Sequence, residues 1–385
     1  MAQKVNKKMA NTNPDLSNHL INPLLKSLKT AVLPVPEMDL IDLTFKNETI
    51  TASEADIKRC ARYVAPLKLD EIVPKAPREV ASFKLVGATP EMANAIRRVL
   101  IDELDVLCLT FDDADFLCTD PYILSDSMKK AIELIPIYQH LDRIKNPQIS
   151  LKIDNLTEEP RLVFAKDISV TAPKTGAAGE NAISPSDHMI ITRVQSGKKL
   201  EIRKFKLIRG KGLIDSGKFS AVANVAYRDI TPGLEQKPVM SKPPSGRTFE
   251  IEFTTHRNVP ATTVLSQCLG SIEQRLAEVG RIFGEIPADF QVSFHSDDLS
   301  VELLVDDFVK IILKKENRTI TDLLAKYIYL EDPQITFVAS ASDHYMINFG
   351  AFIRLKHGQW RAIFAAAIER AQAEVGALAL KVPRG

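Results

Sequence analysis

The segment GATPEMANAIRRVLIDE, residues 87–103, decides the fold predicted for the whole chain. Thr89, Pro90 and Glu91 predict a helix start, because a capping hydroxyl is followed by a proline and then by an acid in the first turn. A strand over residues 82–86 is predicted before this helix, so the segment begins as a strand–helix unit. One face of the helix is apolar and carries Met92, Ile96, Val99, Leu100 and Leu104.

The same pattern recurs near the C-terminal end of the chain. Residues 83–85, Phe-Lys-Leu, lead into the first helix, and residues 309–311, Val-Lys-Ile, lead into a second one. Thr319, with Asp322 three residues later, is expected to form the capping box of this second helix. The two helices align without gaps, which pairs Asn94 with Asp322, Arg98 with Lys326, Leu100 with Ile328, and Glu103 with Glu331.

Each copy is followed by a strand and then by a long amphipathic helix. The strands are expected over residues 248–253 and 351–355, and each helix carries an apolar seam for packing against another helix. Two such seams can be buried against each other about an approximate twofold axis, as in a dimer whose protomers have been joined. The seam residues are Leu265, Leu269, Ile272, Leu276, Val279 and Phe283 on the first helix, and Trp360, Phe364, Ala367, Ala371, Val375 and Leu378 on the second.

The sequence therefore predicts an α+β fold of two related dimerisation units joined in one chain about a pseudo-twofold, with an inserted, mostly β domain in the first unit. Regular structure is expected to begin at Ala81, and loops are expected over residues 171–186 and 230–246. The expected division is an N-terminal extension over 1–80, a first unit over 81–140 and 247–285, an inserted domain over 141–246, a linker over 286–300 and a second unit over 301–385.

Composition favours a protein that binds other proteins. The 385 residues carry a net charge of only +1, but residues 102–126 hold eight carboxylates and no Lys or Arg, whereas residues 198–218 hold eight Lys or Arg. Blocks of opposite sign are typical of surfaces that contact other chains. The four cysteines form no C-x-x-C pair, which favours reduced thiols over zinc or disulfide sites. No apolar run approaches the roughly 18 residues that a membrane span needs.

Three other interpretations start from short motifs. Residues 212–218 nearly match a phosphate-binding loop, giving a P-loop-like nucleotide-binding protein as the alternative function, but Phe219 stands where that loop needs Ser or Thr. The basic block 198–218 could instead bind nucleic acid, although aromatic residues for base stacking are scarce there. Asp112, Asp113 and Asp115 resemble a magnesium triad, but a cluster on a turn is more often a solvated loop. The scattered histidines predict no metal site or catalytic triad.

Several segments together resemble a known family. Residues 94–100, Asn-Ala-Ile-Arg-Arg-Val-Leu, resemble the NALRR-x-L helix of the RNA polymerase α subunit and its third-subunit counterparts. Residues 133–137 resemble the GLIPL segment of that family, and residues 209–222 resemble its glycine-rich and HAKWSPV segments. Residues 319–324 resemble the HTLGNLL helix of the small α-like eleventh subunit. Both partners in one chain is an arrangement similar to that of polymerases encoded by large DNA viruses.

The resemblance implies a non-catalytic assembly-platform subunit of a DNA-directed RNA polymerase, with no cofactor and no metal. It implies contacts with two large polymerase subunits and with small subunits, contact with DNA only through the complex, no membrane, and an internal pseudo-dimer that needs no homo-oligomer. It implies an intracellular protein of the host cytoplasm or nucleus, or one packaged in the virion. The inserted domain here lacks the metal-binding cysteines that some relatives carry.

The resemblance also assigns roles to individual residues. Arg97 and Arg98, on the face opposite the apolar stripe, are expected to anchor the large subunits, because the arginine fork pairs well with carboxylates and carbonyls. The expected large-subunit docking residues are Asn94, Arg97, Arg98, Glu103, Arg209, Lys211 and Lys218. The expected intramolecular dimer seam is formed by Leu265, Leu269, Ile272, Leu276, Trp360, Phe364, Ala367 and Ala371.

Overall fold

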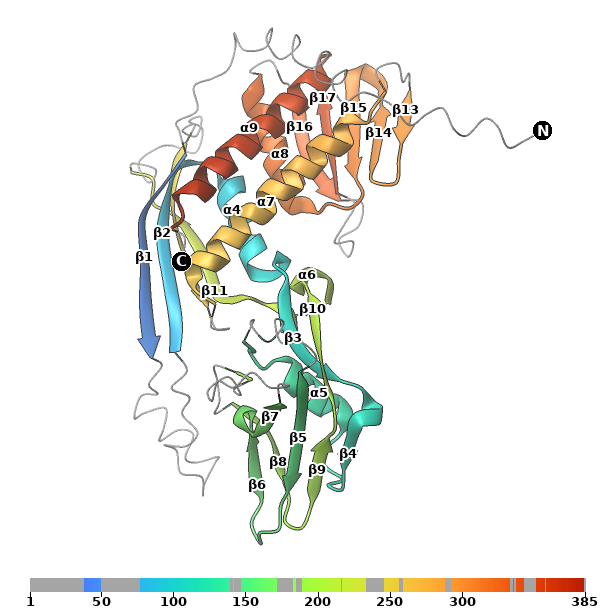
Figure 1. Ribbon diagram of the computed structural model, residues 1–385. Coiled ribbons are helices and arrows are strands. Elements are labelled where there is room, and N and C mark those ends of the chain that lie inside the picture. The colour runs from blue at the N-terminus through green and yellow to red at the C-terminus, as the bar shows by residue number, and fades with distance from the viewer. Residues whose placement is uncertain are drawn as a thin grey trace, which may run out of the picture.

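The computed structural model shows a two-lobed chain of mixed α and β structure, with several antiparallel sheets and six α-helices in the part described (Figure 1). The described residues are 38–49, 77–138, 141, 147–171, 183–184, 189–215, 217–232, 246–255, 259–287, 292–332, 335, 337–342, 351–356 and 358–383. Outside this set lie Cys60, most of residues 1–80, and most of the loops expected over 171–186 and 230–246. No described helix is both long enough and apolar enough to span a membrane.

The first unit is a four-stranded antiparallel sheet covered by helices. Its strand order is β1-β2-β12-β11, with bounds Asp39–Thr49, Pro77–Ala88, Arg247–Thr255 and Val222–Asp229. Helix α4 (Pro90–Arg98) follows β2 and continues as a π-helical turn, Val99–Glu103. Helix α7 (Ala261–Gly284) follows β12.

The second unit is a five-stranded antiparallel sheet with two helices. Its order is β13-β14-β15-β17-β16, with bounds Ser293–His295, Leu299–Leu303, Phe308–Leu313, Ala351–Lys356 and Phe337–Ser342. Helix α8 (Arg318–Glu331) follows β15, and helix α9 (Trp360–Lys381) follows β17. A short 3-10 turn, Val305–Asp307, joins β14 to β15.

The two units have the same connectivity. The sheet order β1-β2-β12-β11 of the first unit corresponds to β14-β15-β17-β16 of the second, and every neighbouring pair is antiparallel. In each unit a short helix follows the second strand of this order and a long helix follows the third. Only the edge strand β13 of the second unit has no described equivalent in the first.

The second lobe is inserted between the π-helical turn and β11. A two-stranded ribbon, β3 (Val106–Phe111) with β10 (Phe205–Gly210), leads into it and back (Figure 1). A four-stranded sheet has the order β4-β9-β5-β7, with bounds Phe116–Cys118, Lys199–Ile202, Gln148–Asp154 and Ile168–Thr171. Strands β6 (Arg161–Phe164) and β8 (Ile190–Val194) pair separately, and helix α5 (Ser125–Glu133) packs beside β3. Helix α6 (Gly212–Asp215) follows β10. Three 3-10 turns complete the lobe and its exit, at Asp113–Asp115, Ala165–Asp167 and Gly217–Phe219.

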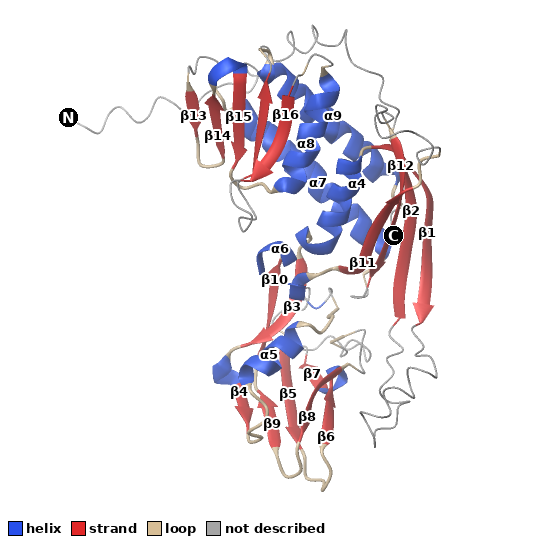
Figure 2. Cartoon of the chain, turned by 180° about the vertical axis from the view of Figure 1, so that it is seen from behind, coloured by secondary structure: helices blue, strands red, loops and turns tan. Residues whose placement is uncertain are grey.

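One continuous core joins the two units. It runs from both sheets through the apolar faces of α4, α7, α8 and α9, which are grouped between the sheets (Figure 2). Helices α7 and α9 pack along each other, with the rings of Phe283 and Phe364 4.6 Å apart and Trp360 edge-on to Phe283 at 6.1 Å. Apolar burial of this extent is the main stabilising term of such a fold. The inserted lobe has a separate core of its own.

The structure differs from the expected division in three places. Strand β1 lies inside the expected N-terminal extension and pairs with β2 from Asp39 to Thr49, so the first sheet begins earlier than Ala81. The expected linker 286–300 contains β13 and the start of β14. The core of the inserted lobe runs from Leu107 to Phe205. It therefore begins before, and ends before, the inserted domain expected over 141–246. Isolated edge strands carry too weak a sequence pattern to be recognised without their partners.

Candidate functional site

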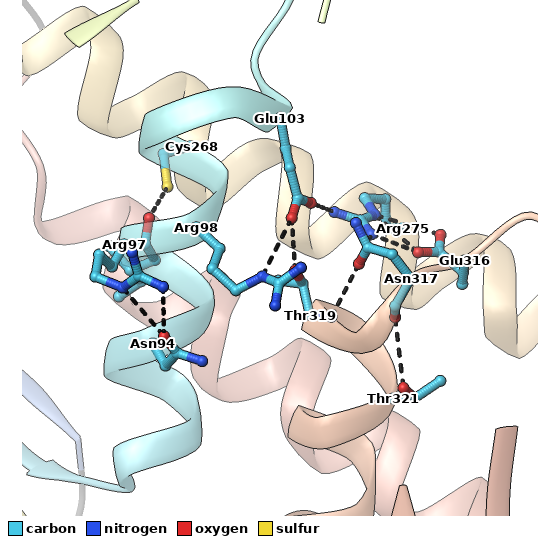
Figure 3. Close-up of polar contacts among 11 residues, drawn as sticks. Asn94, Arg97, Arg98, Glu103, Cys268, Arg275, Glu316, Asn317, Thr319 and Thr321 are labelled. Atoms are coloured by element: carbon cyan, nitrogen blue, oxygen red, sulfur yellow. Dashed lines mark hydrogen bonds and ion pairs between the residues drawn. The ribbon is translucent and has the colours of Figure 1, made fainter. Parts of the chain in front are cut away.

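Glu103 lies at the centre of a polar network where the two units meet (Figure 3). Its side chain is only 3% exposed, and it ends the π-helical turn after α4. One carboxylate oxygen accepts a hydrogen bond from the Thr319 hydroxyl at 2.5 Å, and the other pairs with the guanidinium of Arg275 on α7. Arg98 adds a longer ion pair at 3.8 Å. Glu103 therefore joins α4, α7 and the first turn of α8.

Arg275 extends this network to the N-terminus of α8. It donates from Nε and Nη2 to Glu316, at 3.0 and 2.5 Å, and from Nη2 to Asn317 Oδ1 at 3.0 Å. Burial opposes its charge, but hydrogen bonding to Glu316 and the charges of Glu316 and Glu103 raise the pKa of Arg275 overall. The guanidinium therefore stays protonated and fixes both carboxylates.

The cap of α8 differs from the expected capping box. Asn317, not Thr319, is the capping residue, and its side chain accepts from the Thr319 backbone N–H at 2.9 Å. The Thr319 hydroxyl is engaged by Glu103 instead, so it cannot serve the helix end. Asn317 therefore caps the helix, and the Thr319 hydroxyl contacts the other unit.

A second network of the same kind lies between α8 and α9. Arg370 of α9 contacts Glu331 at 3.2 Å and Glu374 at 3.0 Å, and the Tyr327 hydroxyl donates to Glu374 at 2.6 Å. Burial raises the pKa of Glu331, with the like charge of Glu374 acting in the same direction and Arg370 opposing it. Burial also raises the pKa of the Tyr327 phenol.

The two networks occupy equivalent positions. Glu103 and Glu331 are the residues that the gapless sequence alignment pairs, and each ends the short helical segment of its unit. Arg275 and Arg370 each stand one residue before a seam residue, Leu276 or Ala371, on the long helix of the same unit. A largely buried Glu–Arg pair between the short and the long helix is thus common to both units.

The expected docking residues fall into two groups on either side of the π-helical turn. On α4, Arg97 donates to Asn94 Oδ1 from Nε at 3.1 Å and from Nη2 at 3.0 Å. The second group comprises Arg209 near the end of β10 and Lys211 and Lys218 on either side of α6. The two groups are brought close because Ser220 donates to the carbonyl of Ile101 at 3.1 Å and Gly212 packs on Asp102.

Glu103 and Lys218 each have a partner on another element of the chain. Glu103 is buried and bound by Arg275 and Thr319, so the structure gives it an internal role, and its expected contact with a large subunit stays a prediction. Lys218 is 18% exposed and pairs with Glu133 at 3.1 Å, which ties the loop after β10 to α5. The roles of Asn94, Arg97, Arg98, Arg209 and Lys211 in docking stay predictions.

The expected seam residues are all buried between α7, α9 and the two sheets. Those eight are Leu265, Leu269, Ile272, Leu276, Trp360, Phe364, Ala367 and Ala371. Their small members allow close approach of the helices, and where α7 has Gly280, a Cβ atom would lie 3.3 Å from the Ile368 side chain. The desolvated Cys268 thiol lies in the same core, where burial raises its pKa.

The residues proposed for other chemistry are not arranged for it. Within this motif, residues 212–215 form the four-residue helix α6 and residues 217–219 form a 3-10 turn. Strand β11 comes next, where a P-loop would lead into a long helix. Asp112 pairs with Lys206, and Asp113 accepts from Ser125 at 2.5 Å. Within the described residues no group of three His, Cys, Asp or Glu side chains could hold a metal ion.

Sequence reasoning missed the partners of the two glutamates. Sequence patterns did not single out Arg275, Glu316, Asn317, Arg370 and Glu374, although Arg275 and Arg370 each stand directly before a seam position. An arginine next to a buried stripe, at the same place in both repeats, was the available signal.

The fold and these contacts define a mixed α/β protein with two equivalent sheet-and-helix units sharing one core. No protein-family profile matches the chain. Two viral proteins are similar to it, each described as a DNA-directed RNA polymerase RPB3-11 homolog of African swine fever virus, from a South African tick isolate and a Namibian warthog isolate. Each is 26% identical over 314 residues, covering 75% of this chain and 82% of the relative. The resemblance to joined third-plus-eleventh polymerase subunits of large DNA viruses is thereby confirmed.

Proposed function

We propose that this chain is the non-catalytic assembly platform of a multisubunit DNA-directed RNA polymerase, holding the two large catalytic subunits together. The observation that carries the proposal is the shared connectivity of the two units, β1-β2-β12-β11 and β14-β15-β17-β16, around one continuous core. The names of the two viral relatives describe polymerase subunits that join a third-subunit part and an eleventh-subunit part. Both observations support a fused pair of α-like partners.

The proposal includes a pseudo-twofold relation between the units. Two contacts between equivalent helices support it, because α7 packs on α9 and α4 packs on α8. The Glu103–Arg275 ion pair also has its counterpart in Glu331–Arg370. In a twofold arrangement each surface patch meets its own equivalent, which is the pattern of these contacts. The proposed units are residues 38–105 with 217–287, and 292–383, and the inserted lobe spans 106–210.

The proposed partners are the two large subunits, with the small subunits of the same enzyme. The charge blocks around the π-helical turn and β10 give the chain surfaces of both signs, which suits docking to more than one partner. The chain would contact DNA only through the complex. Because the relatives are viral, the proposal places the protein inside infected cells, in the cytoplasm, the nucleus or the assembled virion.

The test is co-expression of the tagged chain with the two largest polymerase subunits of the same genome. We expect both large subunits to copurify with it, and template-dependent RNA synthesis to appear only in the complex. Arg97→Ala should reduce recovery of a large subunit, whereas Arg281→Ala, an exposed arginine on α7, should not. Recovery of the chain alone, or RNA synthesis by the chain without its partners, would reject the platform function.

A further inference from the structure

A groove of about 520 Å³ is lined by residues of α4, α8, β11 and β16. Figure 2 shows where these four elements lie in the chain. These four elements are two equivalent pairs, one member from each unit. The groove therefore lies on the junction of the two units, where neither unit alone could form it. The side chains that decide its chemistry are Glu91, Asn94, Tyr227, Asp322, Lys326 and Tyr329.

Glu91 lines this groove, and one of its carboxylate oxygens is an unused acceptor. Its Oε2 atom is shielded from solvent and has no hydrogen-bond partner among the described residues. Such an orphaned acceptor costs free energy unless a donor reaches it. Glu91 is part of the first turn of α4, so its backbone is fixed and the carboxylate is held at the groove.

The groove as a whole favours a cation. Two carboxylates, Glu91 and Asp322, face one ammonium, that of Lys326. Within the described residues Lys326 forms no ion pair with either carboxylate, and its Nζ lies 5.5 Å from the ring centre of Tyr329. Among the described residues, Asp322 has only a long contact with the exposed Arg318, at 3.4 Å. Both acids can therefore accept a further donor.

Two aromatic rings flank the acids. Tyr329 is 47% exposed at the groove, and Tyr227 is held edge-on against Phe249 with ring centres 5.8 Å apart. A guanidinium group can stack on such rings while it pairs with carboxylates through its flat fork of N–H donors. A lysine would supply the charge but neither the fork nor the stacking plane.

We propose that this groove receives an arginine side chain from a segment of a large polymerase subunit. The proposal rests on the platform function and adds the chemistry of one contact. Because the groove combines both units, an arginine inserted there engages only a correctly paired platform. The contact would let the large subunit bind the joined pair in preference to a single unit.

The first measurement is site-specific photo-cross-linking in the co-expressed complex. Tyr329 is replaced by a benzoylphenylalanine, and the cross-linked partner peptide is identified by mass spectrometry. We expect a peptide of one large subunit that contains an arginine, and replacement of that arginine by alanine should abolish the cross-link. A cross-link to a segment without arginine, or none at all, overturns the groove proposal.

The second measurement compares affinities of the purified platform for that large subunit. Glu91→Gln with Asp322→Asn should weaken binding about tenfold, the scale of losing charge-assisted hydrogen bonds. Asp322→Asn alone should give a smaller loss of affinity. This single variant keeps the test valid if the double variant fails to fold. Glu369→Gln, an exposed acid on α9, is the matched control and should bind as the wild type does.

The outcomes separate the two proposals. If the wild-type chain copurifies with the large subunits but the double variant binds like Glu369→Gln, the groove proposal falls and the platform function stands. If the wild-type chain recovers no large subunit, the platform function fails and the arginine contact fails with it.

Discussion

Arg275 connects the two units more directly than any other described side chain. One guanidinium binds Glu103 of the first unit and both Glu316 and Asn317 at the start of α8. A buried ion pair of this kind is not a large net source of stability, since both charges lose their hydration. Its effect is selective, because only one arrangement of the units supplies all the partners.

Arg275→Ala should therefore destabilise the protein strongly. It leaves the buried Glu103 with only the longer ion pair to Arg98, and breaking a buried pair typically costs about 3–5 kcal/mol. Urea unfolding measures the difference. Arg281→Ala on the same helix removes only solvent-exposed contacts with Glu278 and Glu285 and should leave stability unchanged. Equal losses in the two variants would contradict the role given to Arg275.

Glu331 gives the protein a pH-dependent contribution to stability. Because burial raises the pKa of Glu331 in the folded state, the folded protein binds this proton more tightly than the unfolded chain. The stabilising contribution is present at pH values below the pKa of Glu331 in the unfolded chain. It is lost as the pH rises through the raised pKa of Glu331 in the folded protein. Glu331→Gln cannot titrate, so the variant should gain stability relative to the wild type over that pH range. Denaturant unfolding at several pH values between about 4 and 7 checks the trend.

At the scale of single residues the sequence predicted half of each network. Glu103 and Glu331 were paired by alignment alone, because they follow the same apolar helix pattern. Their arginines lie 172 and 39 residues away along the chain. Contacts over such separations depend on how whole helices pack, so no local pattern could assign them.

At the scale of elements, the start of α4 was predictable and its end was not. Thr89 accepts from the Met92 N–H at 3.2 Å and Pro90 opens the helix, which confirms the predicted start. The π-helical turn over Val99–Glu103 has no local sequence signature. It forms where Gly212 and Ser220 of the returning chain contact Asp102 and Ile101.

Gly212→Ala tests this packing of α6 on the π-helical turn. A Cβ at Gly212 would lie 3.0 Å from Cβ and 3.1 Å from Cα of Asp102, so the backbone must shift. We expect a loss of about 1–3 kcal/mol in unfolding free energy, as for other overpacked sites. Gly217→Ala is the control, because a Cβ there meets nothing within 4 Å. A neutral Gly212→Ala would show that the close contact is not needed.

Leu269→Asp tests the contact between α7 and α9. Leu269 is fully buried, and an unpaired carboxylate there should cost several kcal/mol, on the order of breaking a buried ion pair. Thermal unfolding should show a large drop in midpoint or an insoluble protein. Gln267→Asp, an exposed position on the same helix, should behave as the wild type does. Similar behaviour of the two variants would place Leu269 outside the shared core.

At the scale of the whole molecule, the units should associate even without their peptide link. The common core draws side chains from both sheets and all four long or short helices of the bundle. Fragments 1–289 and 290–385 expressed together are expected to copurify as a one-to-one complex, and each alone is expected to aggregate through its exposed helix faces. Size-exclusion chromatography with light scattering measures this. Two fragments that are each monomeric and soluble would contradict a shared core.

The overall architecture was largely readable from the repeat, whereas its boundaries were not. Strand β1 adds to the sheet through backbone hydrogen bonds, and Leu40 is its only well-buried side chain among those described. Strand β13 is three residues long. Such peripheral strands gain their structure from the sheet they join, so their sequences alone predict little.

The short connection from α7 to β13 has a consequence for how the two units are produced in the cell. Partners made as separate polypeptides must find each other by diffusion, and their pairing weakens as their concentrations fall. Two halves made by one ribosome meet at a local concentration set only by the length of the tether. The pair is therefore complete at the first copy synthesised, in equal amounts, with no orphan half left to aggregate or be degraded.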